Sequence, residues 1–157
     1  MPNIIVKVPE GAFDEAGRAA LGKGIHAAAK AVEGWGDDPR QEALTWVLVE
    51  EVKPGCLFAG GTDQTARIIP VIVFFYPPAG VIDEAGRAEV MRRVHQAVTA
   101  AKSTSDPRPV ATSIMVWEVA DGTWSANGQL WRLPDFARAA GYRHLQHLIE
   151  PTATSVA

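Results

Sequence analysis

The residue with the clearest chemical potential is Pro2, which stands directly after the initiating methionine and ahead of an apolar stretch at residues 3–8. If Met1 is removed after synthesis, the ring nitrogen of Pro2 becomes a secondary amine, a base that no side chain supplies. An ordinary α-amino group has a pKa of about 7.7–8.0, and burial in an apolar pocket disfavours its charged form. Pro2 is therefore predicted to act as a general base or general acid near neutral pH.

The other residues of reactive type lack a complete set of neighbours. His144 and His147 are three positions apart, with Glu150 beyond them, and could begin a metal site, but no third well-placed ligand follows from the spacing. Cys56 would need an adjacent base or cation to become a nucleophile, and Glu118 could serve as a second acid or base but stands where glutamates are usually solvated. We therefore expect no metal and no cofactor.

The composition limits the function classes. The chain has 157 residues, 47% of them hydrophobic and 21% charged, which is typical of one globular domain. A net charge of −3 gives no general attraction to nucleic acid or to anionic membranes, so neither is an expected partner. The single cysteine and the absence of a signal-peptide pattern favour the cytoplasm. The longest apolar run, residues 68–76, is too short to cross a bilayer, which takes about 20 residues.

A seven-residue motif occurs twice and reveals an internal duplication. "FDEAGRA" at residues 13–19 returns as "IDEAGRA" at residues 82–88, an offset of 69 positions that His26 and His95 also obey. His26 and His95 are therefore expected to serve the same purpose in both copies, either in packing or at the rim of a pocket. Each motif lies between two runs rich in β-branched and aromatic residues, which predict strands.

Between these strands, apolar residues recur at helical spacing in both copies. Asp14 and Asp83 can cap the two helices. Strands joined through a helix should be parallel, so the sequence predicts an α+β fold in which two β-α-β units form a four-stranded sheet with both helices on one face. The apolar stripes of the helices are Leu21, Ile25, Ala28 and Val32 in the first copy and Val90, Val94, Ala97 and Ala101 in the second.

The remaining segments complete a single domain over residues 1–157, with repeats at 1–63 and 67–130 and a C-terminal helix at 134–149. The glycine-rich segments "KPGCLFAGGTD" and "DGTWSANGQ" are expected to form short hairpins or to cover a pocket. The strands are apolar on both sides, as doubly buried strands are. Since the chain has too few residues left to cover the second face of the sheet, we expect an oligomer.

Taken together, these features resemble the tautomerase superfamily, and the length and duplication look like its malonate semialdehyde decarboxylase and cis-3-chloroacrylic acid dehalogenase branches. The matching features are Pro2, "EG" at residues 10–11, the two "DEAGRA" helix starts, "KPGCLFAGG" and "WEVADGTWSANG". The resemblance implies a homotrimer in which the terminal proline is the general base or acid for tautomerisation, hydration or decarboxylation of a small carbonyl compound.

The sequence departs from this family where a substrate carboxylate is usually held by arginines. Ala12 occupies the position after "EG", and residues 78–81 read Pro-Ala-Gly-Val where the long branches have a pair of arginines. By the resemblance, Trp46 lies near an arginine position, Trp124 near a pocket-lining aromatic, and Asn127 in a segment that often lines the pocket. A neutral or aromatic carbonyl or enol substrate is therefore expected.

Two other functions compete with this reading. A trimer that kept the fold but lost the chemistry would explain the missing arginines; Arg67, Arg108 or Arg132 could replace them, but each is more often a surface residue. A dimeric α+β barrel of the ferredoxin-like kind also duplicates β-α-β-like units and suits small aromatic ligands.

Overall fold

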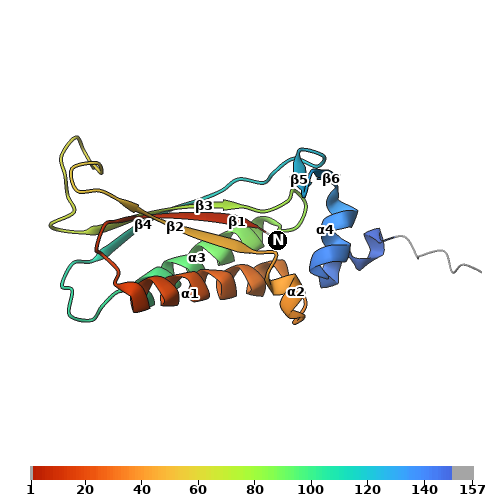
Figure 1. Cartoon of the computed structure of the whole chain (residues 1–157), viewed down its shortest axis with the longest axis horizontal. Helices are drawn as coiled ribbons and strands as arrows, with labels where there is room; N and C mark the ends of the chain where they lie inside the picture. Colours follow the sequence, from red (N-terminus) through yellow and green to blue (C-terminus); the bar gives the residue numbers. More distant parts are fainter. Residues whose placement is uncertain (1, 150–157) are drawn as a thin grey trace, which may run out of the picture.

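The fold is built on one mixed four-stranded sheet covered on one face by two long helices (Figure 1). The computed structural model describes residues 2–149. Strands β1 and β2 are parallel, β1 and β3 antiparallel, and β3 and β4 parallel. The predicted α+β class, with two β-α-β units and both helices on one face, is confirmed. The strands are Asn3–Pro9 (β1), Trp46–Val52 (β2), Ile69–Tyr76 (β3) and Val110–Val116 (β4). Across the sheet they lie in the order β2-β1-β3-β4.

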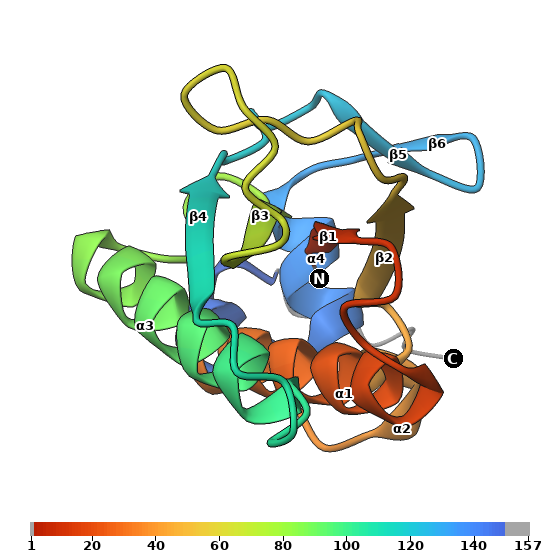
Figure 2. The same ribbon diagram turned by 90° about the vertical axis from the view of Figure 1, so that its left-hand side faces the viewer.

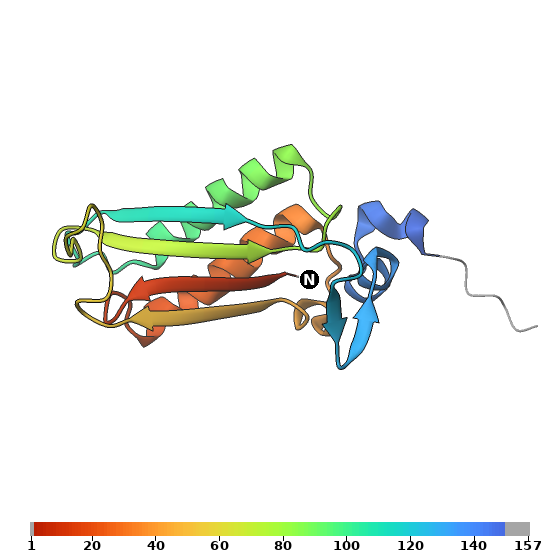
Figure 3. The ribbon, with the colours of Figure 1, turned by 90° about the horizontal axis from the view of Figure 1, so that it is seen from above.

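This strand order separates the fold from the ferredoxin-like alternative. In that arrangement the β-α-β unit is split by another strand, whereas β1 and β2 pair directly along their whole length, from Asn3 with Trp46 to Pro9 with Val52. The two units meet in the middle of the sheet, where β1 pairs with β3. Figure 3 shows the four strands side by side, with β1 and β3 in the centre.

The two long helices, α1 (Glu15–Glu33) and α3 (Glu84–Ala101), begin in the same way in both repeats. The Asp14 carboxylate accepts a hydrogen bond from the Gly17 amide at 2.7 Å, and Asp83 accepts one from Gly86 at 2.7 Å. These are the predicted N-caps. The helices pack closely where Gly24 faces Ala97, since a Cβ atom on Gly24 would lie 2.9 Å from the Ala97 Cβ.

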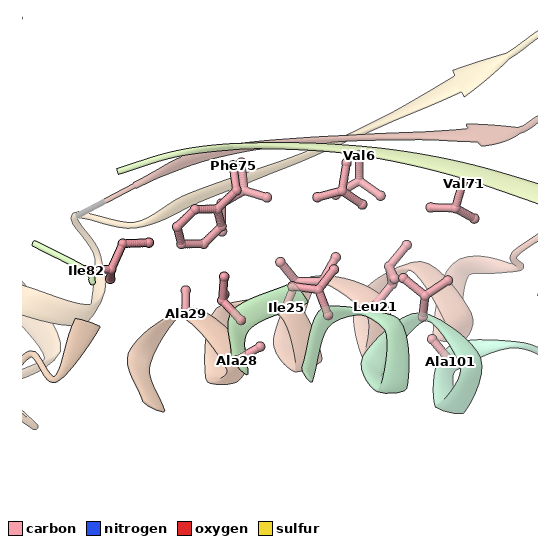
Figure 4. Packing of buried hydrophobic residues seen from close by; sticks show 14 of the residues in the cluster. Val6, Leu21, Ile25, Ala28, Ala29, Val71, Phe75, Ile82 and Ala101 are labelled. Carbon is pink, nitrogen blue, oxygen red and sulfur yellow. The ribbon is translucent and has the colours of Figure 1, made fainter. Parts of the chain in front are cut away.

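The hydrophobic core lies between the sheet and the two helices (Figure 4). Alternate residues of β1 and β3, among them Val6 and Phe75, point towards the helices. On α1 the predicted stripe is buried except for Val32, which is partly buried, and it continues into Glu33. On α3 the fully buried residues are Val90, Val94, Val98 and Ala101, so Val98 takes the place expected for Ala97.

The C-terminal part differs from the prediction of one helix over residues 134–149. Helix α4 spans Leu133–Ala140 and ends because Gly141 adopts a left-handed conformation with φ of 67°. A short 3-10 helix, η1 (Arg143–Leu148), follows. The loop after α1 contains a further short helix, α2 (Pro39–Glu42).

Of the two glycine-rich segments, only the second forms a regular hairpin. Strands β5 (Trp124–Ala126) and β6 (Gln129–Trp131) pair antiparallel, as expected for "SANG". The first segment has an isolated bridge between Ala59 and Thr62. Seen along the strands, this loop and the hairpin both rise on the side of the sheet that the helices leave open (Figure 2).

The helix-free face of the sheet, called the open face below, is apolar. Trp46 on β2 is 69% exposed and Trp117, just after β4, is 72% exposed. Leu48 and Met115 are exposed on the same face, and Ile5 and Phe74 of the central strands lie between them. A contiguous apolar surface of this kind marks an interaction site. No helix within residues 2–149 has the length and hydropathy needed to span a membrane.

Candidate functional site

The candidate site lies at the end of the sheet where β1 begins. Pro2 is buried, and its carbonyl oxygen accepts a hydrogen bond from the Trp46 amide at 3.3 Å. The next residue, Asn3, is in register with Trp46 on one side and with Tyr76 on the other. The first residues of β1 are therefore fixed between the start of β2 and the end of β3.

A cavity of about 270 Å³ opens beside this strand start. Three residues singled out in the sequence, Trp46, Trp124 and Asn127, line it, together with Asn3 directly after Pro2. The structure thus brings Trp46, from the first repeat, to the hairpin of the second. The other lining residues are Ser125 and Ala126, from the glycine-rich segment that was expected to form a hairpin or cover a pocket, and Leu44 and Trp131, which were not expected to line one.

The hairpin positions the aromatic wall of this cavity. Trp124 and Trp131 are cross-strand partners, and the Phe136 ring of α4 makes edge contacts with both, at centroid distances of 5.4 and 5.2 Å. Such edge-to-face packing stabilises aromatic pairs beyond the area they bury. The two tryptophans are consequently held by α4 while their remaining surface faces the cavity.

The backbone conformation of the hairpin turn explains why an asparagine stands at position 127, and its side chain is also placed for binding. It lies at the tip of the β5-β6 hairpin with φ of 51°, followed by Gly128 with φ of 79°. Two successive residues with positive φ are what a type I′ hairpin turn requires, and Asn-Gly is a preferred pair for it. The side chain is exposed at the cavity edge, where its amide could contact a carbonyl group.

A second cavity, of about 470 Å³, lies on the open-face side of the same strand start. It shares Asn3, Trp124 and Ser125 with the first cavity and is also lined by Ile5 and Tyr76. Trp124 therefore stands between two hollows that both adjoin the beginning of β1. Neither cavity is lined by an arginine or a lysine of residues 2–149.

The positions at which the family resemblance implies an arginine lie at opposite ends of the sheet. Val81 is buried in the segment after β3, at the same end of the sheet as Pro2. Ala12 is buried after β1, at the opposite end of that strand. Among residues 2–149, no arginine or lysine therefore lines the cavities at the Pro2 end to hold a carboxylate.

The three arginines considered as replacements have other partners or other locations. Arg67 and Arg108 precede β3 and β4 and so lie at the end remote from Pro2. Arg108 pairs with Asp106 at 2.6 Å. Arg132 lies near the hairpin, but it is exposed and pairs with Asp121 at 3.0 Å. None of the three lines either cavity.

The remaining reactive residues are engaged elsewhere. Glu118 pairs with Arg87 at 3.4 Å, and the first repeat contains the matching pair of Glu51 and Arg18 at the same distance. Cys56 is an exposed loop thiol. Within residues 2–149, His, Cys, Asp and Glu side chains form no cluster suited to a metal, and Glu150 lies outside the described residues.

The equivalent histidines of the repeat have different surroundings. His26 is half-buried, its ring lies 5.5 Å from that of Trp35, and its Nε2 is 3.3 Å from the Glu42 carbonyl oxygen. His95 is exposed, with its Nδ1 2.9 Å from the Thr112 hydroxyl. The shared role expected from the repeat is therefore not observed.

A buried polar pair at the end of α1 was missed in the sequence. Glu33 and Tyr142 are both fully buried, and the Tyr142 hydroxyl donates a hydrogen bond to the Glu33 carboxylate at 2.8 Å. Burial, with the neighbouring Glu33 charge, raises the pKa of Tyr142 far above its usual value. A signal was present, because Glu33 continues the spacing of Leu21, Ile25 and Ala29 on the buried face of α1.

Comparison with solved structures shows the fold. The structure of native fused 4-OT is 17% identical, with a TM-score of 0.65 over 88% of this chain and 98% of that chain. N1, a member of the cis-3-chloroacrylic acid dehalogenase family, is 13% identical, with a TM-score of 0.66 over 95% of this chain and 92% of that chain. The macrophage migration inhibitory factor of Toxoplasma gondii is 13% identical, with a TM-score of 0.60 over 82% of this chain and 99% of that chain.

No protein-family model matches the chain, and no curated protein matches it either. The family likeness therefore rests on the structural comparison. The neighbours are tautomerase-superfamily proteins, and at these identities the likeness establishes the architecture that they share with this chain: paired β-α-β units around a mixed four-stranded sheet.

Proposed function

We propose that this protein is a tautomerase-type enzyme that uses Pro2 as its proton-transfer group on a small aromatic or neutral carbonyl compound. The observation that carries the proposal is the tryptophan-lined cavity beside Asn3, the residue after Pro2. The fold shared with tautomerase-superfamily structures supports it. The reaction requires removal of Met1, because an amide nitrogen can neither accept nor deliver the proton.

The reaction class follows from what the site offers. A positioned secondary amine can move a proton to or from the carbon beside a carbonyl, which is the step that interconverts an enol and a ketone. The aromatic walls formed by Trp46, Trp124 and Trp131 suit a flat, apolar substrate. Without a cation at the cavity, a substrate carboxylate would forgo the charge-assisted hydrogen bonds that arginine gives.

The active unit is proposed to be a homotrimer. The apolar open face requires a cover, and second and third copies of this chain would provide one. The structures of fused 4-OT, described as symmetric and asymmetric trimers, show that proteins of this fold assemble in that way. The candidate site adjoins this face, since the second cavity is lined by Ile5 and Tyr76 of the open side.

The proposal is tested with untagged protein whose intact mass shows the loss of one methionine. Ketonisation is followed for pairs of aromatic enols that differ only in a carboxylate or its neutral ester. Replacement of Pro2 by alanine keeps a free but primary amine, and activity should fall by about 10²-fold or more, the usual contribution of a positioned acid or base. The neutral member of each pair should react at least as well as the acid. A full-length mass, or a Pro2→Ala variant as active as the parent, would refute the mechanism.

A second candidate function is a binding or structural trimer without catalysis. Its specific support is that Ala12 and Val81, at positions where the family resemblance implies cations, are small or apolar and buried. This alternative predicts binding of aromatic carbonyl compounds with no turnover of the enol pairs. It also predicts that Pro2→Ala leaves the binding affinity unchanged.

A further inference from the structure

The β5-β6 hairpin carries most of the aromatic wall of the candidate site, but the four-stranded sheet does not hold it in place. Its two strands pair only with each other and form a separate sheet. Figures 1 and 3 show the hairpin beyond the end of the large sheet and beside α4. An isolated two-stranded hairpin is marginally stable in water. The position of the wall must therefore be fixed by the segments on either side of the hairpin.

The segment that enters the hairpin is tied to the sheet as far as Val119. The Val119 amide donates to the Pro77 carbonyl oxygen at 2.8 Å, and its own carbonyl oxygen accepts from the Ala79 amide at 2.9 Å. The chain then turns, and the Thr123 amide donates to the Ala120 carbonyl oxygen at 3.1 Å. This turn leads directly into β5, so whatever holds the turn also holds the hairpin.

Asp121, inside this turn, connects it to the beginning of α4. Its Oδ1 accepts a hydrogen bond from the Leu133 amide at 2.7 Å, and its Oδ2 accepts one from the Arg132 guanidinium at 3.0 Å. Leu133 is the first residue of α4, so the carboxylate satisfies a free amide at the positive end of that helix. Among residues 2–149, Asp121 makes the only hydrogen bonds that join the two flanks of the hairpin outside the β5-β6 ladder.

The neighbourhood of Asp121 suits an anion at this position. The Leu133 amide, and after it the Arg132 guanidinium, hold the pKa of Asp121 below its usual value, so the carboxylate is charged at neutral pH. Gly122 allows the arginine to come close, since a Cβ atom there would lie 2.9 Å from the Arg132 Nη1. Its φ of 77° also favours glycine.

Because α4 carries Phe136, the same connection determines where the aromatic wall stands. The Phe136 ring makes edge contacts with both Trp124 and Trp131. We propose that Asp121 is a positioning residue that locks the hairpin to α4 and thereby makes the site select aromatic over aliphatic substrates. Asp121 lines neither cavity, so it acts through the tryptophans. The inference rests on the proposed function for its effect on substrate choice, but not for its effect on the hairpin.

The first arm of the test follows the wall by NMR in protein labelled selectively at phenylalanine and tryptophan. In the parent protein, nuclear Overhauser effects (NOEs) should connect the Phe136 ring with both hairpin tryptophans. Asp121→Ala should shift the equilibrium from the docked towards the undocked hairpin about fivefold, the usual effect of removing a helix cap, and so weaken these NOEs. Asp121→Asn, which keeps an acceptor for the Leu133 amide, should restore them.

The second arm compares ketonisation of an aromatic enol with that of an aliphatic enol of the same charge. Asp121→Ala should raise KM for the aromatic enol by about fivefold and leave its kcat, and KM for the aliphatic enol, within about twofold. An aliphatic enol makes less use of a flat aromatic wall, whereas a merely structural role would affect both substrates alike. Asp121→Asn should return KM for the aromatic enol to the parent value.

Asp106→Ala is the matched control. Asp106 also accepts a hydrogen bond from a backbone amide, that of Arg108 at 2.9 Å, and pairs with the same residue's guanidinium at 2.6 Å, but it precedes β4 at the end of the sheet remote from Pro2. Its side chain is 17% exposed, against 46% for Asp121, so its loss should disturb the fold at least as much. It should leave the NOEs and both KM values unchanged.

The two arms separate this inference from the proposed function. If no enol reacts, the proposed function fails and the NOEs still decide whether Asp121 positions the wall. The inference is overturned if Asp121→Ala keeps the parent NOEs, if Asp106→Ala weakens them equally, or if Asp121→Ala raises KM for both enols alike. A parent protein without these NOEs also overturns it, whatever the variants do.

Discussion

Replacement of Trp117 by lysine tests whether the open face of the sheet is buried between subunits. Trp117 is 72% exposed in the single chain and stands two residues after Met115 of β4, on the open face. Burying that share of a side chain of roughly 250 Å² would remove about 180 Å² from water. At about 25 cal/mol per Å², the contact would contribute about 4.5 kcal/mol per subunit when complete.

Even half of this burial has a measurable effect. A loss of about 2 kcal/mol corresponds to a weakening of about thirtyfold at each interface. Lysine also brings a charge that would have to be desolvated on assembly. We therefore expect Trp117→Lys to sediment as a monomer at concentrations at which the parent protein is a trimer.

Sedimentation velocity across a concentration series is the appropriate assay, with circular dichroism to show that the variant is folded. Ala100→Lys is the matched control, because it adds the same charge to an exposed position of α3, on the opposite side of the molecule. The reasoning is refuted if the parent protein is a monomer throughout, if it is a dimer, or if both variants dissociate equally.

The other predictions concern the cap, the pocket and a loop ion pair. Asp83→Ala should lower the free energy of unfolding by about 1 kcal/mol in urea titrations, because the Gly86 amide loses its acceptor. Trp124→Ala should raise KM for aromatic enols more than it lowers kcat, because it removes an aromatic wall of the cavity and leaves Pro2 in place. Arg108 lowers the pKa of Asp106 to about 2, so the stabilisation from this carboxylate is complete above its usual pKa of 3.8 and is lost as the pH falls towards 2. Thermal melts of Asp106→Asn across that range should be less pH-dependent than those of the parent.

Local signals and the duplication were enough to predict the framework. The two aspartate caps, the apolar stripes and the alternation of β1 and β3 act over a few residues, so their meaning does not depend on the rest of the chain. The repeat then predicted parallel strands within each β-α-β unit. It did not predict how the two units join, which is by antiparallel pairing of β1 with β3. The extent of the last helix was mispredicted because the left-handed break at Gly141 overrides the apolar pattern on either side of it.

The site was predictable only in part because its residues meet over long sequence distances. Trp46 and Trp124 were expected near a pocket, but Trp131 joins them through hairpin pairing and contact with Phe136. Glu33 and Tyr142 are 109 positions apart, and only the packing of α1 against the segment after α4 brings them together. A glutamate on an apolar stripe is a usable signal, although it does not identify the partner.

The duplication has a consequence for the number of active centres. Position 71, which corresponds to Pro2 by the offset of the repeat, is Val71, inside β3 and in the middle of the chain. A chain has only one amino terminus, so copying the β-α-β unit copied the scaffold but could not copy a terminal amine. A trimer of this chain would contain six such units but at most three amino-terminal proline nitrogens. The second unit is therefore free to diverge in sequence, and its hairpin instead builds the aromatic wall beside the first unit's terminus.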